Sequence, residues 1–247
     1  VGGNYLALGD MAEVRIGTGF NAAFGSSSAY VVIEASSVIL ESGADVFLDV
    51  ECAGASDKVV VGSTPFGADA LHIRGDINEL RILDAIGDVS VESTTTCTTS
   101  SGNTEVDTMY VFSRSEPTVT IETAVASMDE LNVEGGSVEC SAPVTTVNLY
   151  AGKHKQTSTG AITTLNVYNN SYATLEGSGT VTNLNMYGGN VKFRNNASDG
   201  ITVTNCTLNS GTLDLQSSLR NVTFTNDILN KGGVLRPPLA STVALSY

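Results

Sequence analysis

Apolar and polar residues alternate along short segments of this chain, and two of these segments are almost identical. Residues 164–168 read TLNVY, and residues 183–187 read NLNMY. A period of two residues places alternate side chains on opposite faces of a β-strand. We therefore predict short strands with an inward apolar face, formed by Leu165, Val167, Leu184 and Met186. The Asn and Tyr side chains then point outward.

The same segment recurs along the chain at nearly constant spacing. Its outward Asn is found at Asn132, Asn148, Asn166 and Asn185. In the next copy, residues 205–209, Thr207 takes the Asn position and Asn209 takes the Tyr position. A second, slightly wider-spaced column runs through Asn183, Asn205 and Asn226. Weaker or looser copies begin at Glu79, Thr108 and Phe224.

Most copies continue into a Gly or Asn turn and a second short alternating strand, as in residues 191–193 and 212–215. Two or three strands in roughly 16–22 residues make one coil of a right-handed parallel β-helix, or β-solenoid. A single coil leaves its strand edges unpaired, which explains why the unit repeats. The alternative is an antiparallel sandwich of hairpins. It gives no reason for Asn to stay in register over four copies, so the solenoid is favoured.

Stacked coils place equivalent outward residues about 4.8 Å apart. Asn132, Asn148, Asn166 and Asn185 would then form an amide ladder, and Tyr150, Tyr168 and Tyr187 an aromatic one. Such ladders stabilise solenoids by themselves. A row of outward Tyr is also typical of contact surfaces. The partner would be another copy of this chain or a sugar polymer, and both interpretations stay open.

The repeat divides the chain into three regions. Residues 1–75 are less regular and are predicted to form opening coils or a small β cap, continuous with the solenoid. Residues 76–235 form the coils, with a polar loop at residues 94–103. Pro237 and Pro238 end the strand ladder, since proline cannot donate a hydrogen bond to a next strand. Residues 236–247 are predicted to cap the open end or to reach a neighbour.

Charge is distributed unevenly along the 247 residues, which carry a net charge of −14. Residues 1–140 contain 22 of the 26 acids and have a net charge of −17, whereas residues 141–247 have +3. An acidic chain repels nucleic acid, so no nucleic-acid partner is expected. Apolar runs stay far below the roughly 20 residues that span a bilayer. The start shows no signal-peptide pattern and no initiating Met, so we expect the chain to be processed or to be a piece of something longer.

The cysteines are widely separated in sequence, at Cys52, Cys97, Cys140 and Cys206. No CxxC or Cys/His cluster is present, so we expect no zinc site, no other metal and no cofactor. Buried free thiols are the favoured interpretation. One long-range disulfide remains as the alternative.

Carboxylates are the main candidates for catalysis. Asp45, Asp49 and Glu51 share one face of a strand, and a glycoside hydrolase needs two carboxylates about 5–9.5 Å apart. A solvated face is the simpler interpretation of this row. A polysaccharide lyase would need a Lys or Arg base beside acidic calcium ligands. The candidate bases of the second half, however, lie in an acid-poor region. They are Lys153, Lys155, Lys192 and Arg194.

Other catalytic signatures are missing. The sequence contains no GxSxG, no HExxH and no phosphate loop. His72 and His154 follow no nucleophile pattern, and we interpret both as surface residues. We therefore predict that the chain is not an enzyme.

The run of residues 144–228, with VTTVNLY, ITTLNVY, VTNLNMYGGNVKF, ITVTNCTLNSGTLDL and VTFTNDI, resembles the β-helical repeat proteins of tailed-bacteriophage virions. The resemblance extends over roughly residues 77–235 and carries over no catalytic residue. It implies a structural role on the outer surface of the particle, commonly as a homotrimer. A capsid decoration or cement protein bound to the major capsid protein is the first expectation, and a fibre or spike component bound to another virion protein is the second.

Two rival functions remain. A tailspike-like host-recognition protein would stack the Tyr row on sugar rings and use Asp45, Asp49 or Glu51 as acid and base. A secreted adhesin would need an export signal.

Overall fold

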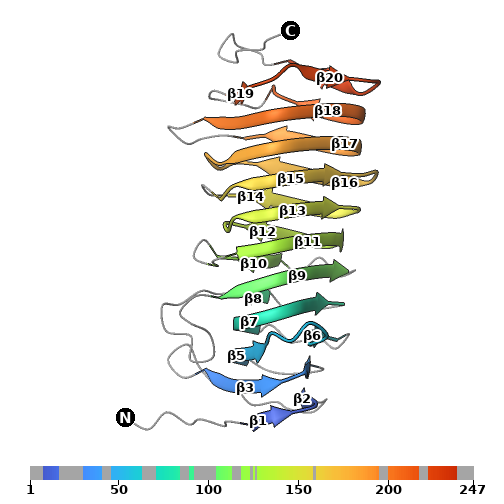
Figure 1. Cartoon of the computed structure of the whole chain (residues 1–247). Helices are drawn as coiled ribbons and strands as arrows, with labels where there is room; N and C mark the ends of the chain where they lie inside the picture. Colours follow the sequence, from blue (N-terminus) through green and yellow to red (C-terminus); the bar gives the residue numbers. More distant parts are fainter. Residues whose placement is uncertain are drawn as a thin grey trace. The chain divides into compact units, whose positions relative to one another are not determined.

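The computed structural model describes residues 8–16, 30–40, 46–62, 71–83, 89–91, 104–112, 118–122, 125, 127–157, 160–194, 200–216 and 222–237. These residues form 21 β-strands and no helix. The paired strands run parallel and stack coil upon coil, as Figure 1 shows within each part of the chain. The predicted parallel β-solenoid is therefore confirmed, and the sandwich of antiparallel hairpins is wrong.

The chain divides into two compact units, residues 1–129 (unit 1) and residues 130–247 (unit 2). The strands that begin in unit 1 are β1 (Leu8–Met11), β2 (Val14–Ile16), β3 (Val31–Ala35), β4 (Ser37–Leu40), β5 (Val46–Cys52), β6 (Lys58–Val61), β7 (Leu71–Ile82), β8 (Val89–Val91), β9 (Glu105–Phe112), β10 (Thr118–Ile121) and β11 (Ser127–Gly135). The strands of unit 2 after β11 are β12 (Ser137–Cys140), β13 (Val144–Leu149), β14 (Gly152–Gln156), β15 (Ile162–Val167), β16 (Ser171–Leu175), β17 (Thr180–Phe193), β18 (Ile201–Asp214), β19 (Val222–Phe224), β20 (Ile228–Asn230) and β21 (Val234–Arg236).

Parallel pairing in unit 1 begins with the first described strand. β1 pairs with β3, β3 with β5, and β5 with the first half of β7. The second half of β7 pairs with β6 and β9, and this register aligns the weak copies at Glu79 and Thr108. Inward residues such as Leu48, Ile73 and Val91 lie in one column and are buried. The described strands within residues 1–75 therefore form coils.

Unit 2 has the regular register that the sequence predicts. Asn132, Asn148, Asn166 and Asn185 are partners in successive coils. Their inward neighbours are fully buried, which confirms the predicted apolar stack for Leu165, Val167, Leu184 and Met186. Burial of about 0.8 kcal/mol per CH₂ makes these columns the main source of stability.

The register changes after Met186. Thr207 opposes Asn185 as predicted, but Tyr187 opposes Ser210 and not Asn209. The assignment of Asn209 to the Tyr position is therefore wrong. The change is local, because Met186 pairs with Leu208 before it and Asn190 pairs with Thr212 after it, as expected of a β-bulge at the turn.

The turns after these strands also stack, and several need glycine. Gly152, Gly189 and Gly211 have φ values of 81°, 63° and 84°. A Cβ on Gly152 would lie 2.5 Å from the carbonyl oxygen of Gly136. Successive turns therefore approach each other too closely for a side chain at these positions.

Several predicted features lie outside the described residues. They are Asp45, Cys97, the loop at residues 94–103, and the part of the tail from Pro238 to Tyr247.

Candidate functional site

Three tyrosines form a stack on the outward side of unit 2. Tyr150, Tyr168 and Tyr187 each follow a buried strand residue, so alternation turns their rings outward. Ring centroids lie 4.8 Å apart for Tyr150 and Tyr168, and 5.1 Å apart for Tyr168 and Tyr187, with 16° between the planes of each pair. Tyr150 is 42% exposed and Tyr187 is 47% exposed. We call these three residues the tyrosine stack.

The stack presents ring edges and hydroxyl groups to solvent. Both faces of Tyr168 are covered by its neighbours, at 4.8 and 5.1 Å. Burial and then the nearby Tyr150 and Tyr187 raise the pKa of Tyr168 above 10. Tyr168 therefore stays protonated at neutral pH. The stack is a row of hydrogen-bonding phenols about 5 Å apart, held rigidly by the coils below.

The amide ladder (Asn132, Asn148, Asn166 and Asn185) runs beside the tyrosine stack. Nδ2 of Asn148 donates to Oδ1 of Asn132 at 3.0 Å, Nδ2 of Asn166 to Asn148 at 2.8 Å, and Nδ2 of Asn185 to Asn166 at 3.0 Å. Nδ2 of Asn148 also donates to Oε1 of Glu130 at 2.8 Å. Asn132 and Asn148 are buried, so this end of the ladder stabilises the fold and is closed to a partner.

A second ladder is exposed. Nδ2 of Asn205 donates to Oδ1 of Asn183 at 2.8 Å, and Nδ2 of Asn226 donates to Oδ1 of Asn205 at 2.6 Å. Every one of these Asn–Asn bonds, in both ladders, runs from the later coil to the earlier one. We call Asn183, Asn205 and Asn226 the outer ladder.

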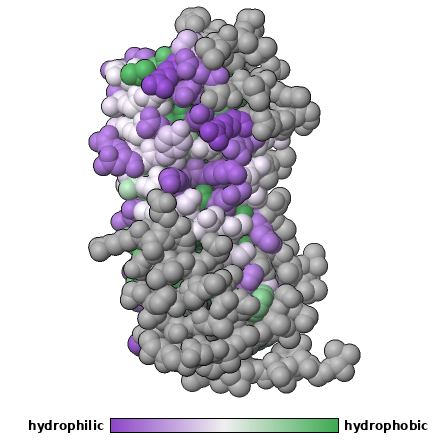
Figure 2. Space-filling view, turned by 180° about the vertical axis from the view of Figure 1, so that it is seen from behind, coloured by the Kyte–Doolittle hydropathy of each residue, from purple (hydrophilic) through white to green (hydrophobic). Residues whose placement is uncertain are grey.

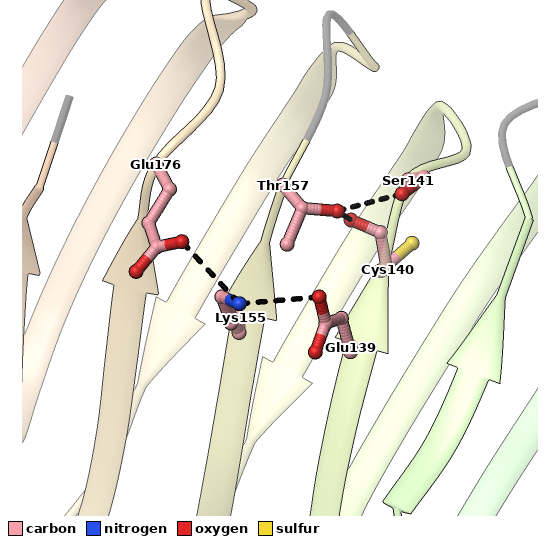
Figure 3. A network of polar contacts seen from close by, with 6 residues as sticks. All are labelled: Glu139, Cys140, Ser141, Lys155, Thr157 and Glu176. Carbon is pink, nitrogen blue, oxygen red and sulfur yellow. Dashed lines mark hydrogen bonds and ion pairs between the residues drawn. The ribbon is translucent and has the colours of Figure 1, made fainter. Parts of the chain in front are cut away.

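A lysine lies between two carboxylates at the ends of β12, β14 and β16 (Figure 3). Nζ of Lys155 is 3.1 Å from Oε1 of Glu139 and 3.3 Å from Oε2 of Glu176. The expectation that the bases of this region lack acidic neighbours is therefore wrong for Lys155. The hydrogen bonds to Glu139 and then to Glu176 raise the pKa of Lys155, so its amine stays protonated and is a poor general base.

Hydroxyl groups extend this network along the strand ends. Oγ of Ser141 and Oγ1 of Thr157 lie 2.6 Å apart, and Oγ1 of Thr157 donates to the carbonyl oxygen of Cys140 at 3.4 Å (Figure 3). These contacts join one coil to the next and leave no activated nucleophile among the six residues drawn.

The acidic row of unit 1 differs from the expected solvated face. Phe47 and Glu51 are at least partly accessible, but Asp49 is fully buried. Its Oδ2 accepts a hydrogen bond from Nε of Arg74 at 3.1 Å and is 3.0 Å from an Nη atom of Arg74. The guanidinium of Arg74 lies 3.8 Å from the ring centroid of Tyr30. Asp49 thus takes part in a buried ion pair and is unsuited to act as a free acid or base.

One predicted surface histidine lies in the core. His154 is 1% exposed, between Val138 and Ala173 in its inward column. Neither ring nitrogen has a hydrogen bond, and burial lowers its pKa to about 4, although nearby Gln156 acts in the opposite direction. Alternation explains the error, because Lys153 and Lys155 point outward and turn His154 inward. His72 is partly exposed and stacks on Phe47, with 4.2 Å between centroids.

The described cysteines are Cys52, Cys140 and Cys206, and all three are buried free thiols as predicted. Burial raises the pKa of each to about 12, so none is a thiolate at neutral pH. In the part of the chain that the structure describes, no group of three or more His, Cys, Asp or Glu residues is placed to hold a metal ion. The same residues include no helix long and apolar enough to cross a membrane.

Hydrophilic side chains dominate the coloured part of the face in Figure 2, with only small apolar areas between them.

Comparisons with known proteins add nothing to this description: no family model, no curated protein and no solved structure matches the chain. The functional argument therefore rests on the residues themselves.

Proposed function

We propose that this chain is a non-enzymatic structural protein of a bacteriophage particle, where it forms a homotrimer that decorates the outer surface of the capsid. The observation that carries the structural role is the tyrosine stack, a rigid row of partly exposed rings in register with the coils. The bacteriophage setting and the trimer come from the resemblance of the repeats.

The state of the candidate catalytic groups supports a role without chemistry. Asp49 is paired with Arg74, Lys155 is held by two carboxylates, and the described thiols are buried. The ion pairs join neighbouring coils, and the thiols are enclosed in the core. The same contacts that stiffen the solenoid therefore remove these groups as acids, bases or nucleophiles.

Protein is the partner that best fits the tyrosine stack. Tyr supplies contact area at low entropic cost and keeps a polar tip, which is why interfaces are enriched in it. A sugar that stacks on an aromatic residue needs an open ring face, but the faces of Tyr168 are covered. The major capsid protein, another virion protein or a further copy of this chain is therefore favoured over a glycan.

Immunogold electron microscopy tests the location. An antibody against this chain is applied to particles purified from its source, and even labelling over icosahedral heads is expected. Label confined to tail tips or fibres would favour host recognition instead. Particles that stay unlabelled, with label on cell surfaces, would overturn the virion assignment.

A variant of the tyrosine stack tests the docking surface. Tyr150, Tyr168 and Tyr187 are changed together to Ser, and binding to particles that lack the chain is measured by co-sedimentation. We expect at least a tenfold loss of affinity, as for interface hot spots of about 2 kcal/mol. Tyr172→Ser is the matched control, because Tyr172 is similarly exposed but lies outside the stack. Equal binding by both variants would show that docking uses another surface.

A further inference from the structure

One sheet of unit 2 carries no charged residue over four successive coils. It consists of β13, β15 and the first halves of β17 and β18, which pair in register and stack as Figure 1 shows. Residues 144–150, 162–168, 180–187 and 201–209 contain no Asp, Glu, Lys, Arg or His. The accessible side chains of these segments belong to Thr, Asn and Tyr. We call the outward surface of this sheet the neutral face.

Charged residues surround the neutral face. Glu130 and Glu134 lie in the coil before it, and Asp227 and Lys231 flank β20, which pairs with its last coil. The strands that follow in the same coils carry charge in one outward column. Its charged members, from β12 to β21, are Glu139, Lys155, Lys192, Asp214 and Arg236. The neutral face therefore does not follow from a general lack of charge in unit 2.

A face of this composition is typical of the centre of a protein interface. Charged residues make up about 25–35% of the surface of a soluble domain. The centres of protein–protein interfaces are instead depleted in charged residues and enriched in Tyr. The neutral face has both properties, because the tyrosine stack lies on it and both Tyr150 and Tyr187 are exposed.

The charge of the chain indicates which protein fits the neutral face. Copies with a net charge of −14 repel each other, and the cost is greatest where like charges come into contact. A face without charge lets identical copies meet without this cost. A different protein would gain affinity and specificity from charges opposite to those of this chain, and the neutral face offers none. A further copy of this chain is therefore the favoured partner.

The tyrosine stack also matches a copy of itself. Its ring centroids are 4.8 and 5.1 Å apart, which is the spacing of the coils. A second copy whose coils lie at the same heights presents its own phenols at the same spacing. A phenol hydroxyl both donates and accepts hydrogen bonds. Hydroxyls that meet around a symmetry axis can therefore satisfy each other at every level of the stack.

We propose that copies of this chain associate through the neutral face, with their tyrosine stacks turned toward the shared axis. This inference rests on the homotrimer of the proposed function and assigns the surface that holds it together. The occupant of the neutral face is a further copy of this chain. The charged column of the same coils then stays available for the capsid protein.

Opposite charges at one position test the assignment. Tyr187→Glu and Tyr187→Lys each place like charges opposite each other in the oligomer, so we expect either variant to associate at least about tenfold more weakly than the unchanged chain. An equimolar mixture brings opposite charges together and should recover mixed oligomers. Sedimentation velocity of the purified full chain measures association, and native mass spectrometry identifies oligomers that contain both variants. Tyr172→Glu is the matched control, because Tyr172 is 40% exposed on β16, outside the neutral face.

Salt gives a second readout on the unchanged chain. At about 1 M salt the Debye length falls to about 3 Å, so repulsion between copies is screened. An interface without charged residues has no ion pair to lose. We therefore expect association as strong as at low salt, or stronger. Dissociation by salt would show that charged surfaces hold the copies together and would overturn the proposal.

Three further results would overturn it. They are a monomeric unchanged chain, equal association of the Tyr187 and Tyr172 variants, and a mixture of the two Tyr187 variants that stays dissociated. Circular dichroism confirms that each variant is folded.

The outcome is separable from that of the proposed function. If the triple Ser variant of the tyrosine stack loses particle binding but stays associated, the neutral face docks on the capsid protein. The proposed function then stands and this inference is wrong. If particles stay unlabelled while the purified chain associates as expected, the bacteriophage setting is wrong and the neutral face remains a contact between copies.

Discussion

Units 1 and 2 have the same kind of apolar core but differ in the charge that their residues carry. Both stack columns of Val, Leu and Ile that are almost completely buried. Unit 1 contains 19 acidic and five basic residues, for a net charge of −14, whereas unit 2 contains seven of each. The whole net charge of the molecule therefore belongs to unit 1.

The contrast is sharpest in two outward columns. In unit 1, Glu34, Glu51, Asp76 and Glu105 are partners in successive coils, and we call them the acid column. In unit 2 the corresponding arrangement is the amide ladder. An amide both donates and accepts, so identical amides bond to each other. Ionised carboxylates only accept, and like charges in neighbouring strands repel.

Unit 1 balances its acids with a few cations placed on aromatic rings. Arg74 pairs with Asp49 over Tyr30, and Arg81 pairs with Glu79 at 2.6 Å, with its guanidinium 5.4 Å from the ring centroid of Tyr110. Unit 2 uses neutral ladders in its Asn and Tyr columns and keeps an ion network elsewhere, where Lys155 lies between Glu139 and Glu176. A column of stacked amides or phenols is therefore stable by itself. In a column of like charges, the repulsion has to be reduced by cationic partners, by salt or by protonation.

Removal of Arg74 should break unit 1 most severely. Arg74→Met removes the cation that pairs with the buried Asp49, and loss of one member of a buried pair costs about 3–5 kcal/mol. Urea unfolding monitored by hydrogen exchange in β5 measures the change. Arg81→Met is the matched control, since it breaks a more exposed pair and should cost less than about 1 kcal/mol. Equal costs would contradict the buried-pair argument.

Acid should affect unit 2 through His154. Its pKa is lowered from 6.5 to about 4 by burial, so the unfolded chain binds the proton first as the pH falls. The stabilisation is complete above pH 6.5 and is lost progressively between pH 6.5 and 4, by about 3 kcal/mol in total. Hydrogen exchange in β14, measured across this range, checks the loss.

Two variants separate this effect from the rest of unit 2. His154→Leu should leave β14 protected equally at pH 7 and pH 4. His72→Leu, in unit 1, should leave the acid sensitivity of β14 intact.

Asp107 of unit 1 has a pKa raised by burial and by Asp129 and Asp76, so its titration favours the folded state as the pH falls. If acid destabilised unit 1 and left unit 2 unchanged, the predicted role of His154 would be wrong.

The two amide columns of unit 2 should differ in strength. Asn148→Ala removes bonds to Asn132, Glu130 and Asn166 at a buried position and should cost about 2 kcal/mol. Asn205→Ala removes two bonds in the exposed outer ladder, where water replaces them, and should cost about 0.5–1 kcal/mol. Chemical unfolding of both variants measures the difference. An equal cost would mean that burial does not set the strength of a ladder.

Regular spacing made unit 2 predictable from sequence. One Asn per coil identified the pairing register, and the alternation around it identified the inward residues. The same logic failed after Met186, because a local bulge shifts the register, and the spacing of the repeats does not reveal it. Repeats therefore predict coils well and predict their irregularities poorly.

Unit 1 and the core polar residues were harder to predict. Asp49 and Arg74 are partners in adjacent coils that lack the Asn and Tyr signal, so their pairing left no repeated pattern. His154 lies in a KHK triplet, which reads as a solvated run unless alternation is followed residue by residue. The type of residue suggests whether a side chain is buried or exposed, but its position in the alternation of the strand determines the direction in which it points.

The smallest effect should appear in the acid column. Glu34→Gln replaces the first member by an amide and removes its repulsion from Glu51. Because these side chains are largely solvent-exposed, we expect the melting temperature of unit 1 to rise by only about 1–2 °C at low ionic strength. At about 1 M salt the Debye length falls to about 3 Å, and the gain should disappear. Calorimetry at the two ionic strengths measures it, with Asn166→Asp in unit 2 as the converse variant. That change introduces a carboxylate into the amide ladder, and a gain in stability there would contradict the distinction between the two columns.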